Sequence, residues 1–308
     1  MRRTAETLTP DTLDLKDYLS KKKAVVDSAL EAYLAETKDP ASHVVDAMRY
    51  SLFAGGKRLR PILCLAGAAT VGGMGKNALP VACALEMIHT YALIHDDLPV
   101  MDDDNLRRGK PTNHKVFGEA VALLAGDGLL TEAFNLIATA EITQDVTADV
   151  LLRVTSMIAQ ASGYRGMIGG QLLDIQWEGK TANPALVELI HTRKTGALIM
   201  VSVTSGAILG GGNETQIQAI ATYGEKTGLA FQISDDLLDI EGDSYAMGKM
   251  AGADQKKGKL TYPSAFGLDR SRDIQAKLVE SAIESLALLG PNAEPLRRIA
   301  RYIIERNK

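Results

Sequence analysis

Cysteine, a secretory leader and a long uncharged run are all scarce or missing in this sequence. Cys64 and Cys83 are the only cysteines, and both stand in apolar helical patterns without metal-like spacing. We therefore expect reduced core residues of a cytoplasmic protein. Polar residues follow the two N-terminal arginines, which argues against a signal peptide and indicates a flexible tail over residues 1–15. The longest uncharged stretch, residues 196–213, is short for a membrane span, so it predicts a buried core helix and no membrane span.

A strong net charge and strand-like patterning are also absent. The formal net charge is −4, which argues against nucleic-acid binding, so anions would have to be attracted locally. Alternating β-branched runs are nearly missing, whereas apolar residues recur at helical spacing along most of the chain. With 46% hydrophobic residues and no low-complexity linker, the pattern predicts one all-α domain over residues 1–308, a bundle of about ten or more helices.

Turn-forming residues divide the helical pattern into segments. The first segment has an expected apolar face of Val25, Ala29, Ala32 and Tyr33. Further helices are expected around residues 58–70, 78–96, 118–140, 146–165, 184–209, 214–239, 272–288 and 294–306. Breaks with Gly, Pro or Asn chemistry separate them at residues 38–40, 72–75, 110–111, 183–184, 210–213 and 290–291.

Two aspartate-rich clusters lie far apart in the chain, each directly after an apolar stretch. The first is Asp96-Asp97-Leu98-Pro99-Val100-Met101-Asp102, and the second is Asp235-Asp236-Leu237-Leu238-Asp239. A lone Asp-Asp pair is usually a solvated helix terminus or turn. Here the pattern occurs twice in matching context, and close carboxylates in apolar surroundings need a counter-charge. Mg²⁺ shared with a substrate phosphate supplies one, so the clusters predict a metal-diphosphate site.

The spacing within the first cluster predicts a local break in its helix. Asp96 and Asp102 are six positions apart and lie about 240° apart around a regular helix. Pro99 disfavours regular helix here, so we expect the helix to end or distort near Leu98 and to bring Asp102 beside Asp96. His89 precedes Asp96 by two turns on the same face, and it is expected to line the same cavity.

Basic residues flank both clusters. Lys57 and Arg60 follow a glycine pair at the expected start of a helix, where backbone N–H groups also favour anions. Arg107 and Arg108 directly follow the first cluster and suit bidentate phosphate contacts. A single basic residue is most often a solvated surface charge. Taken as a set, these residues predict a site for two diphosphates; its other members are Lys194, Lys249 and Lys259.

This ordered set of motifs resembles the trans-isoprenyl diphosphate synthases, and it is most similar to the bacterial farnesyl diphosphate synthases. The markers are residues 55–61, the first cluster with residues 107–112, and residues 169–174, 194–195, 231–239 and 258–263. The resemblance covers nearly the whole chain. It implies helices around a deep central cavity and a homodimer. It also implies head-to-tail condensation of isopentenyl diphosphate with dimethylallyl or geranyl diphosphate to make farnesyl diphosphate.

The resemblance further implies a role for each matching position. Direct ligands of three Mg²⁺ ions, with Mn²⁺ as an alternative metal, would be Asp96, Asp102 and Asp235. Supporting partners would be Asp97, Gln171, Asp174 and Asp239. The allylic diphosphate would be held by Arg107, Lys194, Lys249 and Lys259, and isopentenyl diphosphate by Lys57, Arg60, His89 and Arg108. Beside the carbocation would be Thr195 and Gln232.

Product length is expected to depend on the residues one turn deeper than the first cluster. Tyr91 precedes Asp96 by five positions, and one helical turn of about 5.4 Å is comparable to an isoprene unit. The hypothesis is that its ring blocks elongation beyond farnesyl, and the alternative is that Tyr91 is only core packing. Ala92 is small, so geranylgeranyl diphosphate stays open as the alternative product.

Three other functional classes can be tested against the same residues. His95-Asp96 resembles the dyad of HD-type metal phosphohydrolases, with His89 or His114 as a further ligand. That class leaves the second acidic cluster unexplained. A terpene cyclase would not need the Lys57/Arg60/His89 set, and a non-catalytic partner subunit would be expected to lack one of the two clusters.

Overall fold

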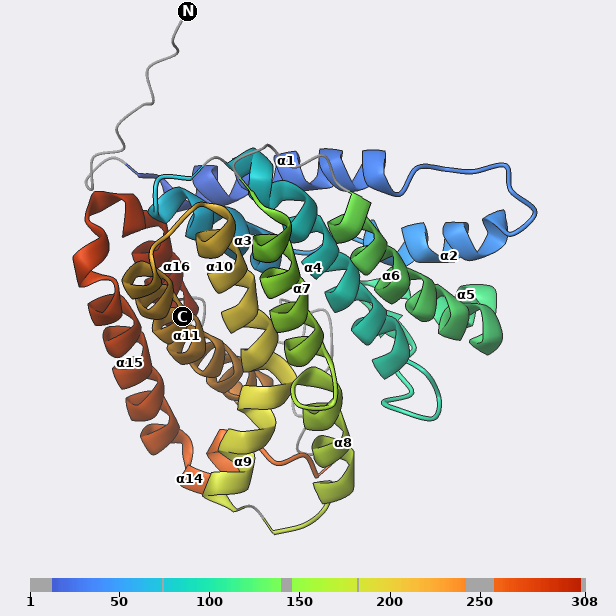
Figure 1. Cartoon of the computed structure of the whole chain (residues 1–308). Helices are drawn as coiled ribbons and strands as arrows, with labels where there is room; N and C mark the ends of the chain where they lie inside the picture. Colours follow the sequence, from blue (N-terminus) through green and yellow to red (C-terminus); the bar gives the residue numbers. More distant parts are fainter. Residues whose placement is uncertain (1–12, 74, 140–145, 182, 242–257, 306–308) are drawn as a thin grey trace, which may run out of the picture.

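The computed structural model describes residues 13–73, 75–139, 146–181, 183–241 and 258–305. Within these residues the chain is a helical bundle with one small two-stranded hairpin (Figure 1). The all-α fold expected from the helical periodicity is therefore confirmed. The predicted breaks lie between α-helices or at a helix's first residues, and Lys110–Pro111 forms the strand β2.

The elements follow one another in a simple order along the chain. The α-helices are α1 (Leu15–Tyr33), α2 (Ser42–Leu52), α3 (Leu59–Thr70), α4 (Gly75–Asp96), α5 (Asn113–Phe117), α6 (Glu119–Thr139), α7 (Ala148–Ser162), α8 (Met167–Trp177), α9 (Pro184–His191), α10 (Ala197–Leu209), α11 (Glu214–Glu241), α14 (Tyr262–Phe266), α15 (Leu268–Ser285) and α16 (Glu294–Glu305). The other helical turns are the π-helical η1 (Thr192–Gly196) and the 3-10 turns η2 (Ala287–Leu289) and η3 (Pro291–Ala293). The antiparallel hairpin is β1 (Leu106–Arg107) with β2 (Lys110–Pro111).

The core is centred on α10, which packs against α3, α4, α7 and α11. Nearly all of its residues are buried, so the prediction of a buried core helix here is confirmed. The approach of α3 to α10 requires two glycines. A Cβ added to Gly67 would lie 2.2 Å from the Val203 carbonyl oxygen, and one added to Gly206 would lie 1.8 Å from that of Cys64. This packing fixes α4 and α11, the two helices that carry the acidic clusters.

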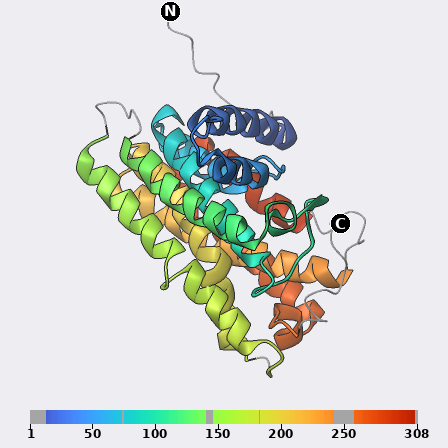
Figure 2. The same cartoon turned by 90° about the vertical axis from the view of Figure 1, so that its right-hand side faces the viewer.

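Two helices have the length and composition of a membrane span. The apolar window of α4 is 72% buried inside the bundle, as expected of a core helix. The corresponding window of α6 is 39% buried. Its outward face includes Leu123 and Leu124, which are 47% and 56% exposed. Figure 2 shows α6 at an outer side of the molecule.

The N-terminal helix differs from the sequence prediction in two respects. The buried Leu13 precedes α1, and its carbonyl oxygen accepts a hydrogen bond from Arg298, so the fold begins inside the range expected to be a tail. The expected apolar face was also wrong, since Val25 is 48% exposed whereas Val26 and Leu30 are buried. The reason is that α1 packs on the core with the face that carries Val26 and Leu30, which is shifted by one residue from the expected face.

Candidate active site

The first acidic cluster forms where α4 ends. The helix ends at Asp96, and the backbone N–H of Asp102 donates to the Asp96 carbonyl oxygen at 2.8 Å. The carbonyl oxygen of Leu98 accepts from Met101 N at 2.9 Å, which closes the turn. The predicted break near Leu98 and the return of Asp102 to Asp96 are therefore confirmed.

Asp96 is half-buried, and several charged side chains act on its carboxyl group. Burial raises the pKa of Asp96 to about 6. The ammonium of Lys194 lowers this pKa, the Asp102 carboxylate raises it, and Arg107 and Lys259 lower it. Residues from α4, from η1 and from the segment after α11 thus converge on one carboxyl group.

Asp97 points to a different partner from Asp96. The Nε of Arg107 donates to both carboxylate oxygens of Asp97 at 2.7 and 2.8 Å, and its Nη2 donates to Oδ1 at 2.5 Å. Burial raises the pKa of Asp97, and Arg107 partly offsets this effect. Arg107 also lies 3.5 Å from Asp104. Because Arg107 belongs to β1, this contact ties the hairpin to the end of α4.

The segment after α11 reaches the first cluster through Lys259. Its ammonium nitrogen lies 3.3 Å from Oδ1 of Asp102. The second cluster itself is carried by α11, where Asp235 is half-buried and Asp239 is buried. The charge of Asp235 acts on the Arg60 guanidinium. Lys249, the remaining predicted cation, lies outside the described residues.

Lys194 and Thr195 are positioned by the π-helical turn η1. A single π turn between α-helices is often found at functional sites. Lys194 Nζ lies 2.5 Å from Oδ2 of Asp174 in α8. A Cβ on Gly170 would lie 2.3 Å from the Lys194 backbone nitrogen, so only glycine allows α8 to approach this closely. The Thr195 hydroxyl donates to Oε1 of Gln232 at 2.7 Å. Gln171 is half-buried on the same helix as Asp174.

The second basic group is a cluster of arginines around His89. Burial lowers the pKa of Arg60 to about 10, and its Nε is buried without a hydrogen-bond partner. Burial and the neighbouring Arg60 and Arg108 hold the pKa of His89 well below its usual value. Arg108 donates to the Gly55 carbonyl oxygen. A guanidinium nitrogen left unpaired beside a neutral imidazole suits an anion that the chain itself does not provide.

Lys57 has different surroundings from the rest of its predicted set. It is exposed, and its Nζ lies 5.9 Å from the centre of the Tyr302 ring in α16. Between Lys57 and Arg60, Arg58 is an N-terminal anchor of α3 rather than a site residue. Its buried guanidinium binds Glu86 at 2.8 Å and Asp27 at 2.7 Å.

Tyr91 and Ala92 lie on α4 before the acidic cluster, as expected from their spacing. Tyr91 is 5% exposed, and its hydroxyl is buried without a partner. Burial raises the pKa of Tyr91 to about 12, and the charge of Asp96 adds to this. Ala92 is half-buried.

The histidines are not arranged as a phosphohydrolase centre requires. His95 Nε2 lies 3.0 Å from the Leu123 carbonyl oxygen on α6, and His114 Nδ1 lies 3.3 Å from the Thr112 hydroxyl. Among the residues that the structure describes, no three His, Cys, Asp or Glu side chains lie close enough together to hold a metal ion by themselves. The contacts of His95 and His114 do not favour the HD-type alternative, which needs His95 and a second histidine as direct ligands.

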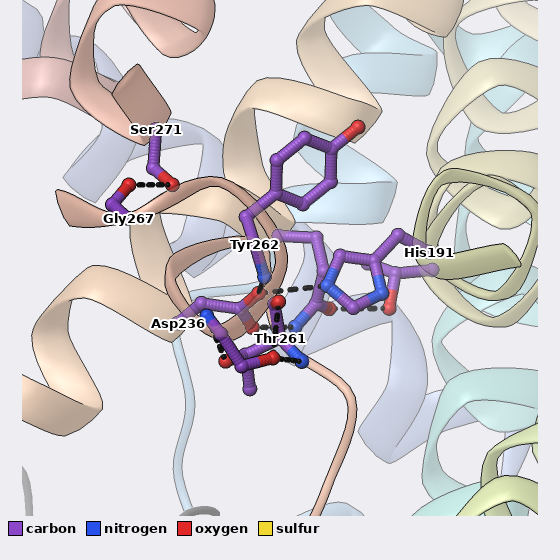
Figure 3. A network of polar contacts seen from close by, with 9 residues as sticks. His191, Asp236, Thr261, Tyr262, Gly267 and Ser271 are labelled. Atoms are coloured by element: carbon purple, nitrogen blue, oxygen red, sulfur yellow. Dashed lines mark hydrogen bonds and ion pairs between the residues drawn. The ribbon is translucent and has the colours of Figure 1, made fainter. Parts of the chain in front are cut away.

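Two residues of this region were given no role from the sequence. His191 Nε2 lies 2.7 Å from Oδ2 of Asp236, and the backbone N–H of Tyr262 donates to the same oxygen at 2.9 Å (Figure 3). Asp236 was named only as a member of the second acidic cluster, and the signal for His191 was a polar residue inside an apolar helical pattern, which needs a partner when buried. The sequence could not identify that partner.

Comparison with known proteins gives one consistent family. The polyprenyl synthetase family model matches residues 41–287. The chain is 45% identical to the farnesyl diphosphate synthase of Geobacillus stearothermophilus, over 96% of this chain and 99% of the relative. It is also 45% identical to the geranylgeranyl diphosphate synthase of Cyanophora paradoxa, over 96% and 97%.

A solved structure gives the same result for the fold. The apo crystal structure of an FPP/GFPP synthase from Zymomonas mobilis is similar with a TM-score of 0.84 and 38% sequence identity. The match covers 94% of this chain and 98% of that one. Because the names of these relatives include products of different length, similarity alone supports the reaction type more strongly than the product.

Proposed function

The chain belongs to the polyprenyl synthetase family, and we propose that this member is a farnesyl diphosphate synthase. Its reaction class is that of a trans-prenyltransferase, which joins isopentenyl diphosphate head to tail with an allylic diphosphate. The observation that supports a farnesyl product is the buried aromatic ring of Tyr91 on α4, within the electrostatic reach of Asp96. Ala92 beside it supports geranylgeranyl diphosphate as the second candidate product.

The acidic clusters have the donor chemistry that Mg²⁺ requires. Asp96 is half-buried with a raised pKa, and Asp102 lies beside it, so a divalent cation there would supply the missing counter-charge. We assign Asp96, Asp102 and Asp235 as the ligands, with substrate and water oxygens completing each coordination shell. The residues that would support them are Asp97, Gln171, Asp174 and Asp239. When bound, magnesium withdraws charge from the departing diphosphate.

The cations around the first cluster hold the allylic diphosphate in this proposal. Lys194 and Lys259 already lie within ion-pair distance of Asp174 and Asp102, so a diphosphate can exchange one partner for another without moving them far. Arg107 is held by its contact with Asp97, which pre-orients its guanidinium. Lys249 completes the set. These charges stabilise the negative charge that develops as the allylic C–O bond breaks.

The second diphosphate is assigned to the group around His89. Arg60 has an unpaired buried Nε, and Arg108 and His89 share its surroundings. The two close guanidinium charges of Arg60 and Arg108 favour an anion that binds without a metal. Isopentenyl diphosphate would be held here, with Lys57 approaching from the exposed side.

The condensation itself needs no side-chain nucleophile. Thr195 and Gln232 supply oxygen dipoles beside the allylic carbon, and backbone oxygens of the η1 turn add to them. The alkene of isopentenyl diphosphate attacks the allylic carbon, and a new carbon–carbon bond forms. The proton lost from C2 of the adduct moves to an oxygen of the released diphosphate, and a new double bond remains.

We also propose that the protein is a homodimer through α6. Leu123 and Leu124 on α6 are exposed, as is Leu152 on α7 at 67%. An apolar helix face of this kind is typical of an interface between subunits. A second copy of the chain is the occupant that the family resemblance implies.

Product analysis tests the proposed function. The enzyme is incubated with Mg²⁺, labelled isopentenyl diphosphate and, in separate reactions, dimethylallyl, geranyl or farnesyl diphosphate. We expect fifteen-carbon product from the first two and little turnover of the third. Twenty-carbon product from all three would replace farnesyl with geranylgeranyl diphosphate. Free phosphate or a cyclic hydrocarbon alone would contradict the assignment to prenyl transfer.

A further inference from the structure

A chain of hydrogen bonds connects buried residues behind the site to the two residues proposed to face the carbocation. His191, at the end of α9, contacts Asp236 of α11 at 2.7 Å (Figure 3). The other carboxylate oxygen of Asp236 accepts from Gln232 Nε2 at 3.0 Å. Gln232 Oε1 in turn accepts from the Thr195 hydroxyl at 2.7 Å. Thus α9, η1 and α11 are connected through one amide side chain.

The direction of each hydrogen bond in this chain follows from its partners. The backbone N–H of Tyr262 can only donate, so Oδ2 of Asp236 is an acceptor. The nitrogen of the Gln232 amide must face Asp236, because the reverse orientation would set two acceptor oxygens against each other. Oε1 of Gln232 therefore faces Thr195, whose hydroxyl donates to it. The lone pairs of the Thr195 oxygen are left for another partner.

Burial separates the two ends of this chain. His191 is 5% exposed and Asp236 is 2% exposed, whereas Thr195 and Gln232 are half-buried. Asp236 has an acidic neighbour, Asp235, that is half-buried. Successive helical residues point about 100° apart, so the two carboxylates of the Asp-Asp pair serve different partners. The carboxylate of Asp236 contacts His191 of α9 and the Tyr262 backbone N–H of α14.

We infer that His191 and Asp236 are positioning residues that fix the orientation of the Gln232 amide, whose carbonyl oxygen in turn orients the Thr195 hydroxyl. His191 holds Asp236, Asp236 holds the Gln232 nitrogen, and the Gln232 oxygen orients Thr195. Two oxygen dipoles are thereby fixed before substrate binds, which lowers the cost of reorganisation during ionisation. This inference rests on the proposed placement of Thr195 and Gln232 beside the allylic carbon.

The test uses two substitutions that differ in one hydrogen bond. His191→Leu removes the donor to Asp236 at similar volume, and His191→Gln keeps a donor nitrogen near the position of Nε2. For His191→Leu we expect kcat to fall by about 10- to 100-fold, which is typical when a residue that orients a directly acting side chain is lost. The KM for isopentenyl diphosphate should change little. His191→Gln should recover most of kcat. The matched control is Ser271→Ala, which removes a nearby hydrogen bond of 2.7 Å to Gly267.

A second readout separates positioning from general loss of structure. A misdirected amide should leave the cation open to water, so His191→Leu should release more allylic alcohol per condensation product. In that side reaction water bonds to the allylic carbon, its proton goes to diphosphate, and the C–O bond to diphosphate breaks. The double variant His191→Leu/Gln232→Leu should have a kcat within about 2-fold of that of Gln232→Leu alone, because His191 acts through Gln232.

The outcomes distinguish this inference from the function on which it rests. Wild-type kinetics of Gln232→Leu would overturn the proposed placement of Gln232 itself. Impaired Gln232→Leu together with near-normal His191→Leu would overturn only the inference. Equal losses in His191→Leu and His191→Gln, with an unchanged share of alcohol and a lowered melting temperature, would assign the pair a purely structural role and also overturn it.

Discussion

The ammonium nitrogen of Lys259 lies 3.3 Å from a carboxylate oxygen of Asp102. Asp102 follows α4, whereas Lys259 lies between α11 and α14. This contact therefore brings the segment before α14 to the first acidic cluster. Lys259 balances part of the negative charge that Asp102 shares with Asp96. A diphosphate arriving between them would meet a cation already in position.

Lys259→Ala is expected to weaken use of the allylic substrate. A hydrogen bond to a charged group contributes about 2 kcal/mol, so kcat/KM should fall by roughly 30-fold. Lys259→Arg should retain part of the activity because the charge remains. Steady-state kinetics with varied allylic diphosphate measure the effect, and Lys115→Ala, an exposed lysine, is the control. Unchanged kinetics in Lys259→Ala would remove Lys259 from the binding set.

Tyr91→Ala is expected to lengthen the product. Removing the buried ring opens space one turn below Asp96, and one additional isoprene unit is comparable to the rise of a turn, about 5.4 Å. The fraction of products with twenty or more carbons should then increase. Chromatography of dephosphorylated products measures it, with Tyr164→Ala at an exposed position as control. A product profile like that of the wild type would mean that Tyr91 serves only core packing.

The histidine among the arginines is expected to make stability depend on pH. The pKa of His89 is well below 6.5 in the folded protein because of burial and the nearby arginines. Below pH 6.5 the unfolded chain therefore binds more protons than the folded one, and the free energy of unfolding falls as pH decreases. His89→Gln should make that slope shallower by at most about 1.4 kcal/mol per pH unit. Urea unfolding between pH 5 and 7 measures both slopes, and identical slopes would contradict the effect.

A charge on the exposed face of α6 is expected to separate the proposed dimer. Leu124→Lys would place an ammonium group in an apolar contact, which is costly unless it is paired. The mass in solution should fall from about twice 33.0 kDa to about that of one chain. Light scattering after size exclusion measures it, with Val25→Lys on exposed α1 as control. A wild-type mass of one chain would refute the proposed dimer directly.

Local chemistry made much of the fold predictable from the sequence. Pro99 cannot continue a regular helix, so the end of α4 and the return of Asp102 follow from covalent geometry. The helices α3, α6 and α11 also follow from apolar spacing, because each presents several turns of regular pattern to the core. The helix α8 was missed, since its glycines weaken the helical signal although Gly170 is required by close packing.

Features that depend on long-range contact could not be predicted. The pairing of His191 with Asp236 requires α9 to meet α11, and no local pattern specifies that meeting. The π turn at η1 was hidden in a continuous apolar segment, because one additional residue per turn leaves little trace in periodicity. The face of α1 was misjudged by one residue because Val25 and Val26 are equally apolar, and only tertiary packing selects between them.

Calorimetric binding of an unreactive allylic thiodiphosphate tests most directly whether the two aspartate clusters bind diphosphate through magnesium. For the wild type we expect strong binding with Mg²⁺ and a large loss of affinity when EDTA replaces it. Asp96→Asn and Asp235→Asn should each remove most of the magnesium-dependent gain, while Asp127→Asn, an exposed aspartate on α6, should not. Equal affinity with and without Mg²⁺, or full magnesium dependence in both variants, would contradict the proposed role of the clusters.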